Sequence, residues 1–240
     1  MRTMRLPLVV GGSAAAWALL CLDRAGWVPA GLCSTYSQAP LWRVSPLELA
    51  SHWLPMELAM MLPLALLPLA FLHDRSLARR RWRAEWAFLS AYLLLWLVAG
   101  GCLQVLVAVL RGYLATTGTA LAVAVALLWQ CSPVKQRSLN GCHRQPRLSA
   151  FGLAADRDAW GYGIAYGRYC IGACWALMLL PLMVEQGHLF GMAVCMLFAL
   201  GERLETPAAP AWGWHGPGKA LRLLWRLTGA SARVRMARGI

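Results

Sequence analysis

The stretch GYGIAYGRYCIGACWALM, residues 161–178, decides how the rest of the chain is interpreted. It has the apolar character of a membrane-spanning helix, yet it carries two thiols and a thioether. Cys170, Cys174 and Met178 follow one another at i, i+4 and i+8, so in a helix they share one face with about 80° of drift. Contact with lipid gives no reason to align sulfur atoms. The spacing therefore indicates metal binding, redox chemistry or packing against a neighbouring helix.

Composition indicates that this stretch belongs to an all-α, polytopic membrane protein. Of the 240 residues, 59% are hydrophobic and 14% charged, whereas a soluble protein carries about 25% charged residues. The apolar residues form blocks that predict six transmembrane helices, at residues 6–22, 54–72, 86–110, 113–129, 161–184 and 189–201. We interpret the first block as a retained helix because it is long for the apolar region of a signal peptide. The predicted transmembrane domain covers residues 1–205, and residues 206–240 form a Pro/Gly linker and a basic amphipathic tail.

The distribution of positive charge predicts the orientation of these helices. Of the 23 Lys and Arg residues, all but Arg24, Arg43 and Arg111 fall on the side that holds both termini. The positive-inside rule then places the N and C termini in the cytoplasm and the chain in the inner (plasma) membrane, as a multi-pass protein. Because the basic residues flank the helices, we expect the net charge of +13 to attract an anionic inner leaflet. We expect no nucleic-acid partner.

The predicted orientation also sorts the sulfur-containing residues. Cys142, Cys170 and Cys174 lie toward the cytoplasmic side, where thiols stay reduced, so we expect no structural disulfide within the chain. Met56 and Met60 share one face of the predicted helix over residues 54–72. Soft thiolates and thioethers select Cu(I), although Met and free Cys also serve as plain packing residues in apolar helices.

Two further features of the apolar blocks concern helix packing and buried charge. Gly161, Gly163, Gly167 and Gly172 are expected to let another helix approach closely. Glu57 lies inside the helix predicted over residues 54–72, where a carboxylate either faces the helix bundle or touches the outer headgroups.

Three blocks together resemble a known family. They are WLPMELAMMLP (residues 53–63), WQCSPVKQRSLNGCHRQP (129–146), and GRYCIGACWALM (167–178) with the trailing GERL (201–204). Their order and spacing resemble the bacterial family of predicted metal-binding integral membrane proteins, a domain of unknown function, over about residues 50–204. The residues that match its motifs are Trp53, Met56, Met60, Met61, Pro63, Gln130, Pro133, Lys135, Cys142, Pro146, Tyr169, Cys170, Gly172, Cys174 and Trp175. Ala173 departs from the pattern, because the family has a cysteine there, and His143 separates Cys142 from Arg144.

The resemblance implies metal binding, and it names no reaction. Together with the sulfur spacing it gives a predicted ligand set of Cys142, Cys170, Cys174, Met178, Met56 and Met60. Cu(I) is the favoured ion, and Zn(II) stays open. The predicted function is the binding, delivery or transport of a soft metal, with a metal-delivery or membrane protein as partner.

Two other interpretations remain open at this stage. A scaffold or assembly subunit would use the glycine faces and the basic tail to hold partners or further copies of itself. A membrane thiol oxidoreductase would cycle its cysteines, although the sequence contains no CxxC pair. Nothing indicates a hydrolase, since the GxSxG, HExxH and P-loop motifs are all missing from the sequence.

Overall fold

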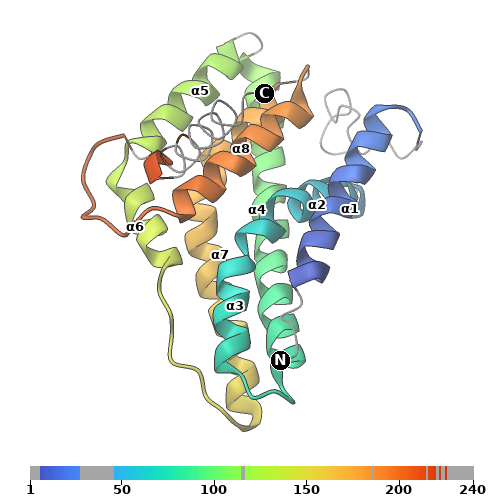
Figure 1. Ribbon diagram of the computed structural model, residues 1–240. Helices are drawn as coiled ribbons and strands as arrows, with labels where there is room; N and C mark the ends of the chain where they lie inside the picture. The colour runs from blue at the N-terminus through green and yellow to red at the C-terminus, as the bar shows by residue number, and fades with distance from the viewer. Residues whose placement is uncertain are drawn as a thin grey trace, which may run out of the picture.

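The computed structural model describes residues 6–27, 46–114, 117–184, 186–214 and 216–219, with the single residues 222 and 225. In this part of the chain the fold consists of eight helices and no strand, which confirms the predicted all-α class (Figure 1). The helices are α1 (Leu6–Arg24), α2 (Pro46–Leu64), α3 (Leu66–Arg75), α4 (Arg81–Leu114), α5 (Thr117–Gln130), α6 (Pro133–Cys142), α7 (Gly152–Met183) and α8 (His188–Arg203). The long helices α4 and α7 pack along each other and form the centre of the bundle (Figure 1).

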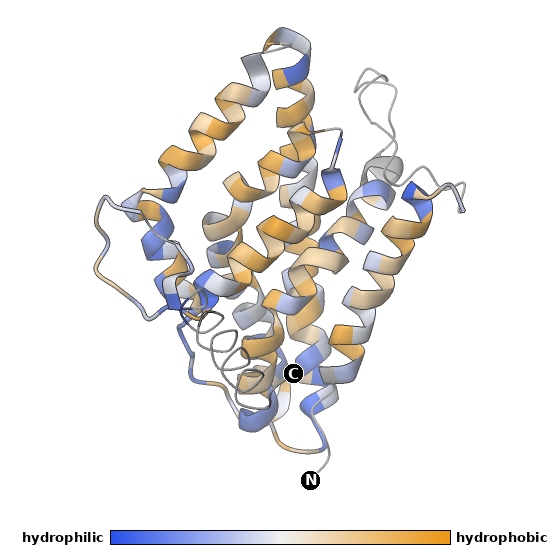
Figure 2. Cartoon of the chain, turned by 45° about the horizontal axis from the view of Figure 1, so that its top comes forward, coloured by the Kyte–Doolittle hydropathy of each residue, from blue (hydrophilic) through white to orange (hydrophobic). Residues whose placement is uncertain are grey.

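Only some of these helices could cross a membrane by length and composition. Among the described residues, α4 and α7 do so alone, and the pairs α2/α3 and α5/α6 do so only if each bent pair counts as one span. The prediction of six spans is therefore supported in part, at two to four. Apolar side chains lie exposed along the outer faces of α4 and α5, where the helices are coloured as hydrophobic in Figure 2, among them Leu94, Val98, Val105, Leu121 and Leu127. A contiguous exposed apolar surface of this kind is typical of a face that meets lipid.

The predicted helix over residues 54–72 is broken at Ala65, where α2 and α3 meet at 59°. Prolines explain why this break is stable. Pro63 has no N–H, so the carbonyl of Ala59 loses its helical partner. The Ser13 hydroxyl and the Trp17 indole of α1 donate to this carbonyl instead, at 2.8 and 3.1 Å. The α1 helix thus stabilises the proline-containing part of α2.

Two buried tyrosines satisfy the carbonyls that the break itself leaves free. Pro68 cannot donate to Leu64, and the Tyr166 hydroxyl of α7 donates to the Leu64 carbonyl at 2.7 Å. The Tyr92 hydroxyl of α4 lies 3.2 Å from the Met61 carbonyl and donates to it. The broken end of α2 is therefore fixed against both central helices, and this fixes where its methionines lie.

The predicted helices at residues 113–129 and 161–184 leave residues 130–160 as a connecting loop, and this is wrong in part, because the segment contains α6 and the first turns of α7. The start of α6 has a local cause that the sequence analysis missed. The Ser132 hydroxyl accepts a hydrogen bond from the Lys135 backbone N–H at 3.2 Å, and Pro133 occupies the first helical turn. Serine at the N-cap followed by proline is a strong helix start.

The residues after α8 pack against α6. The Asn140 side chain donates to the Ala208 carbonyl at 2.7 Å and accepts from the Ala208 N–H at 3.2 Å. The Gly213 N–H donates to the Cys131 carbonyl at 3.0 Å. The predicted basic tail beyond residue 219 lies almost wholly outside the described residues, as do Arg2, Arg5 and Arg43.

Three of the four glycines predicted to allow close packing do so. Gly163 and Gly167 face α4, where a Cβ on Gly163 would lie 2.5 Å from the Phe88 carbonyl oxygen. Gly172 faces α6, where a Cβ would lie 2.6 Å from a serine hydroxyl. The prediction is wrong for Gly161, which has no other atom within 4 Å of a Cβ.

This difference predicts unequal effects of two neighbouring substitutions. Gly163→Ala is expected to lower the free energy of unfolding by about 1–3 kcal/mol, because the added methyl group meets backbone that cannot move aside. Gly161→Ala is the matched control, and it should be neutral or stabilise the helix by up to about 1 kcal/mol. Thermal unfolding of both variants in detergent measures the difference. Equal melting temperatures would show that α4 and α7 do not pack at Gly163.

Candidate metal centre

The predicted thiols Cys170 and Cys174 form a buried pair on α7. Both side chains are shielded from solvent, and the two thiols lie within interaction distance of each other. Arg203, near the end of α8, places Nη2 3.0 Å from the Cys170 Sγ and 3.8 Å from the Cys174 Sγ. The Tyr92 hydroxyl lies 3.3 Å from the Cys170 Sγ on the other side. A guanidinium against two thiols stabilises their thiolate forms, which are the forms that bind metal.

Cys142, the third predicted thiol ligand, ends α6 and is half-buried. Its thiol donates to the Ser138 carbonyl at 3.3 Å, and it also interacts with Arg203. In the part of the chain that the structure describes, no three His, Cys, Asp or Glu side chains are arranged to hold a metal ion. Cys142 therefore lies beside the Cys170–Cys174 pair without completing a three-thiol site.

The predicted methionines gather at a second place. Met56 and Met60 of α2 and Met178 of α7 line a small enclosed cavity of about 10 Å³, together with Trp53, Glu57, Met61 and Pro181. This volume is at the lower limit for one water-sized occupant, so the cavity has room for a single ion and no more. The structure thus divides five of the six predicted ligands into a thiol pair and a thioether cavity, and the sixth, Cys142, lies beside the thiol pair.

The two groups are adjacent along α7. Met178 follows Cys174 by one helical turn, a rise of about 6 Å, and both side chains are buried. The predicted sulfur face of this helix is therefore confirmed as an interior face. It connects the thioether cavity with the thiol pair.

A buried polar network holds the end of α8 beside the thiols. The Lys135 ammonium of α6 lies 2.8 Å from Glu202 Oε1, and it donates to Gln130 Oε1 at 2.5 Å. The Gln130 amide in turn donates to Glu202 Oε1 at 2.6 Å. All three side chains are buried. Their hydrogen bonds join α5, α6 and α8 at Glu202, the residue that precedes Arg203. This network fixes the position of the guanidinium.

A polar pocket of about 230 Å³ lies next to the thiol cluster, between the ends of α6 and α8. His143, Asn140, Glu202, Glu205 and Trp214 are among the residues that line it. Burial and the positive charges of Arg203 and Lys219 lower the pKa of His143. Its imidazole is therefore neutral at pH 7.

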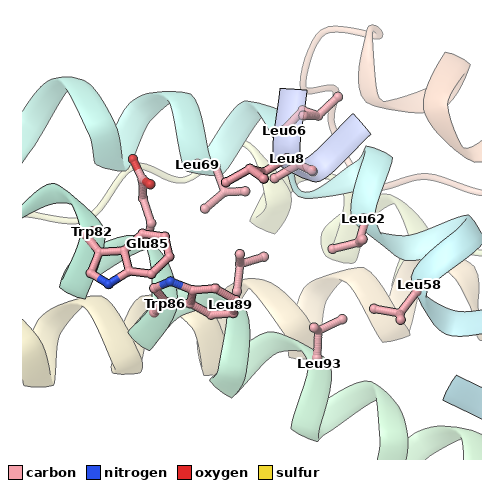
Figure 3. Close-up of a pocket in the computed structure, with 11 residues that line it drawn as sticks. Leu8, Leu58, Leu62, Leu66, Leu69, Trp82, Glu85, Trp86, Leu89 and Leu93 are labelled. Carbon is pink, nitrogen blue, oxygen red and sulfur yellow. The ribbon is translucent and has the colours of Figure 1, made fainter. Parts of the chain in front are cut away.

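An apolar groove of about 180 Å³ lies between α1, α2, α3 and α4 (Figure 3). None of the described residues that line it carries sulfur. Leucines and the two indoles of Trp82 and Trp86 make up most of its lining. Its carboxylate, Glu85, is paired with His73 at 2.7 Å. This groove offers no set of metal ligands.

Glu57 is buried inside the helix bundle, which is one of the two positions predicted for it. For Arg203, Lys135 and Glu202 the sequence pattern predicted no role in a site. Each is a charged side chain within or at the end of an apolar helix, which is the signal that could have identified them. Gln130 and Lys135 also lie in the second block of the family resemblance. Their partners come from distant helices, so spacing alone could not pair them.

Comparison with known proteins supplies the family. Residues 50–224 match PpoB2, described as a copper chaperone, over more than half of the chain and over all six predicted ligands. No curated protein and no solved structure matches the chain. The metal-related part of the predicted resemblance is supported by this match. The chain belongs to the PpoB2 copper chaperone family.

Proposed function

We propose that this protein is a membrane-embedded copper chaperone that holds Cu(I) through sulfur and passes it to a partner protein. The observation that carries the proposal is the buried sulfur face of α7, with two thiols and one thioether in register and two more thioethers opposite on α2. Thiols and thioethers are the donors that favour Cu(I) over hard cations. The copper ion is the cargo of this protein rather than a fixed cofactor.

The thiol pair provides the tighter of two positions. Cu(I) between the thiolates of Cys170 and Cys174 forms a complex with a net charge of −1, and the buried Arg203 guanidinium balances that charge. Within the described residues, Arg203 Nε and Nη1 make no hydrogen bond, so the guanidinium retains donors for such a complex. Ala173 leaves two thiols here instead of three, which suits two-coordinate Cu(I).

The thioether cavity provides a weaker position one turn away. Met56, Met60 and Met178 carry no charge, so they hold copper less tightly than thiolates do. A step from the cavity to the thiol pair moves the ion along α7 by about one helical turn. Cys142 and the adjoining polar pocket extend this path toward the surface.

The membrane is the environment that best fits the exposed apolar faces of α4 and α5. The charge distribution favours the bacterial inner membrane, with the thiol end of α7 toward the cytoplasm and the basic segments against an anionic leaflet. In this orientation the protein takes up copper from its thioether side and delivers it to a cytoplasm-facing partner.

Elemental analysis of the detergent-purified protein tests the proposal. Protein produced with copper and zinc at equal concentration is expected to retain copper in stoichiometric amount and only traces of zinc. The preference follows from thioethers and paired thiols, which suit Cu(I) better than tetrahedral Zn(II). A protein that holds zinc, or neither metal, would contradict the proposed function.

A further inference from the structure

Glu57 is a buried carboxyl group with no cationic partner among the described residues. Its side chain is 1% exposed, and both carboxylate oxygens lack a well-formed hydrogen bond. The Trp53 indole lies beside the carboxyl group and interacts with it without forming an aligned bond. Burying a carboxylate without a partner costs several kcal/mol, so such groups are normally paired or bind a cation.

Among the described residues, those that line the Glu57 cavity contain sulfur and no basic group. The other residues that line its cavity are Trp53, Met56, Met60, Met61, Met178 and Pro181. None of these side chains is a cation, and the neighbouring thioethers are neutral. The cavity therefore combines soft donors with one carboxyl group that no cation neutralises.

The local sequence explains this arrangement. Met60 and Met61 follow Glu57 by three and four residues, the spacings at which helical side chains are neighbours. Gly100 of α4 has no side chain, and the Trp53 indole fills the space that this leaves. A Cβ on Gly100 would lie 2.0 Å from Trp53 Cε2. Trp53 is thereby held against the carboxyl group.

We propose that Glu57 binds the same ion as Met56, Met60 and Met178, which makes the cavity a thioether–carboxylate site for a soft monovalent cation. This inference rests on the proposed function. It adds a carboxylate ligand to the weaker of the two copper positions, and it predicts that this position prefers a monovalent ion. Three neutral thioethers leave the charge of Cu(I) unbalanced in an apolar interior, and one carboxylate balances it. A divalent ion would keep an excess positive charge there, so the site selects by charge as well as by softness.

The test isolates the cavity by working in a Cys170→Ser/Cys174→Ser background in which the other six cysteines are also serine, so that no thiol competes for the ion. Purified protein is titrated with Ag(I), a closed-shell monovalent ion that replaces Cu(I) and does not oxidise in air. The background is expected to bind one Ag(I) ion, and adding Glu57→Gln should weaken this binding by roughly 10–100-fold. Glu85→Gln is the matched control, because Glu85 is a buried carboxylate that already has His73 as partner, and it should leave the affinity unchanged.

A purely structural role for Glu57 gives a different result. It predicts that Glu57→Gln lowers the melting temperature of the metal-free protein and leaves Ag(I) affinity unchanged. Our proposal predicts an unchanged or higher melting temperature without metal, since the substitution removes an unpaired buried charge. If Glu57→Gln does not fold, Glu57→Asp decides, because withdrawing the carboxylate by one methylene weakens binding only if it touches the ion.

Each further outcome separates this inference from the proposed function. Equal Ag(I) affinity with and without Glu57→Gln overturns the role of Glu57. If the wild type binds the ion and the cysteine-free background binds none, the inference is overturned and the thiol position stands. If the wild type itself binds no Ag(I) or Cu(I), the proposed function fails.

Discussion

Replacing Cys170 and Cys174 together by serine is expected to remove the more tightly held of the two Cu(I) ions from the purified protein. Both thiols lie against Arg203, and with them the protein loses the two thiolates that hold this ion. A serine hydroxyl is a hard donor that remains protonated at neutral pH. Binding by the variant should therefore be limited to the thioether cavity.

Competition with a chromogenic Cu(I) chelator measures this loss in both stoichiometry and affinity. Cys21→Ser/Cys102→Ser is the matched control, because it also removes two thiols, from exposed positions on α1 and α4. The control should bind copper as the wild type does. If both double variants bind equally well, the α7 thiol pair is not a copper site.

Lys135→Met is expected to destabilise the folded protein by about 3–5 kcal/mol, because it leaves the carboxylate of Glu202 buried without its cation. The effect should extend to the metal centre. Glu202 precedes Arg203 in α8, so losing the ion pair frees the helix end that holds the guanidinium against the thiols. The variant should therefore also bind Cu(I) less tightly.

Thermal unfolding of three variants in detergent checks this expectation. Lys135→Met/Glu202→Met should recover most of the lost stability, since an apolar pair of similar volume replaces the buried ion pair. Arg83→Met is the control, as Arg83 is 65% exposed and its pair with Asp156 contributes at most about 1 kcal/mol. If Lys135→Met costs no more than Arg83→Met, the buried network does not hold α8 in place.

Helical periodicity was sufficient to predict the sulfur face of α7. Apolar length located most helices, and the i, i+4 spacing put Cys170, Cys174 and Met178 on one face, which the structure buries. The break at Ala65 was missed because it depends on hydrogen bonds from distant helices. The bend at Ala65 persists because Tyr92 and Tyr166 satisfy the carbonyls freed there, and a tyrosine 31 or 102 residues away gives no local signal.

The division of the predicted ligands into two groups also required the structure. Spacing joins residues of one helix, but it does not say that Met56 and Met60 meet Met178 or that Cys142 lies beside the other thiols without completing a three-thiol site. Arg203 and Lys135 stand in different segments of the chain, and only packing brings their charges to the same interior. The family match favours metal handling over the scaffold and oxidoreductase interpretations that the sequence left open.

The most direct test of whether sulfur on α2 and α7 holds the metal is a Cu(I) titration of two proteins. One is the wild type, and the other is a variant without the five buried sulfur ligands. The variant combines Met56→Leu, Met60→Leu, Met178→Leu, Cys170→Ser and Cys174→Ser, which keeps side-chain volume close to that of the wild type. The wild type is expected to bind two more Cu(I) ions per chain than the variant, with both proteins eluting as the same folded species in size-exclusion chromatography. Equal copper in the two proteins would contradict the assignment of these residues as the copper ligands.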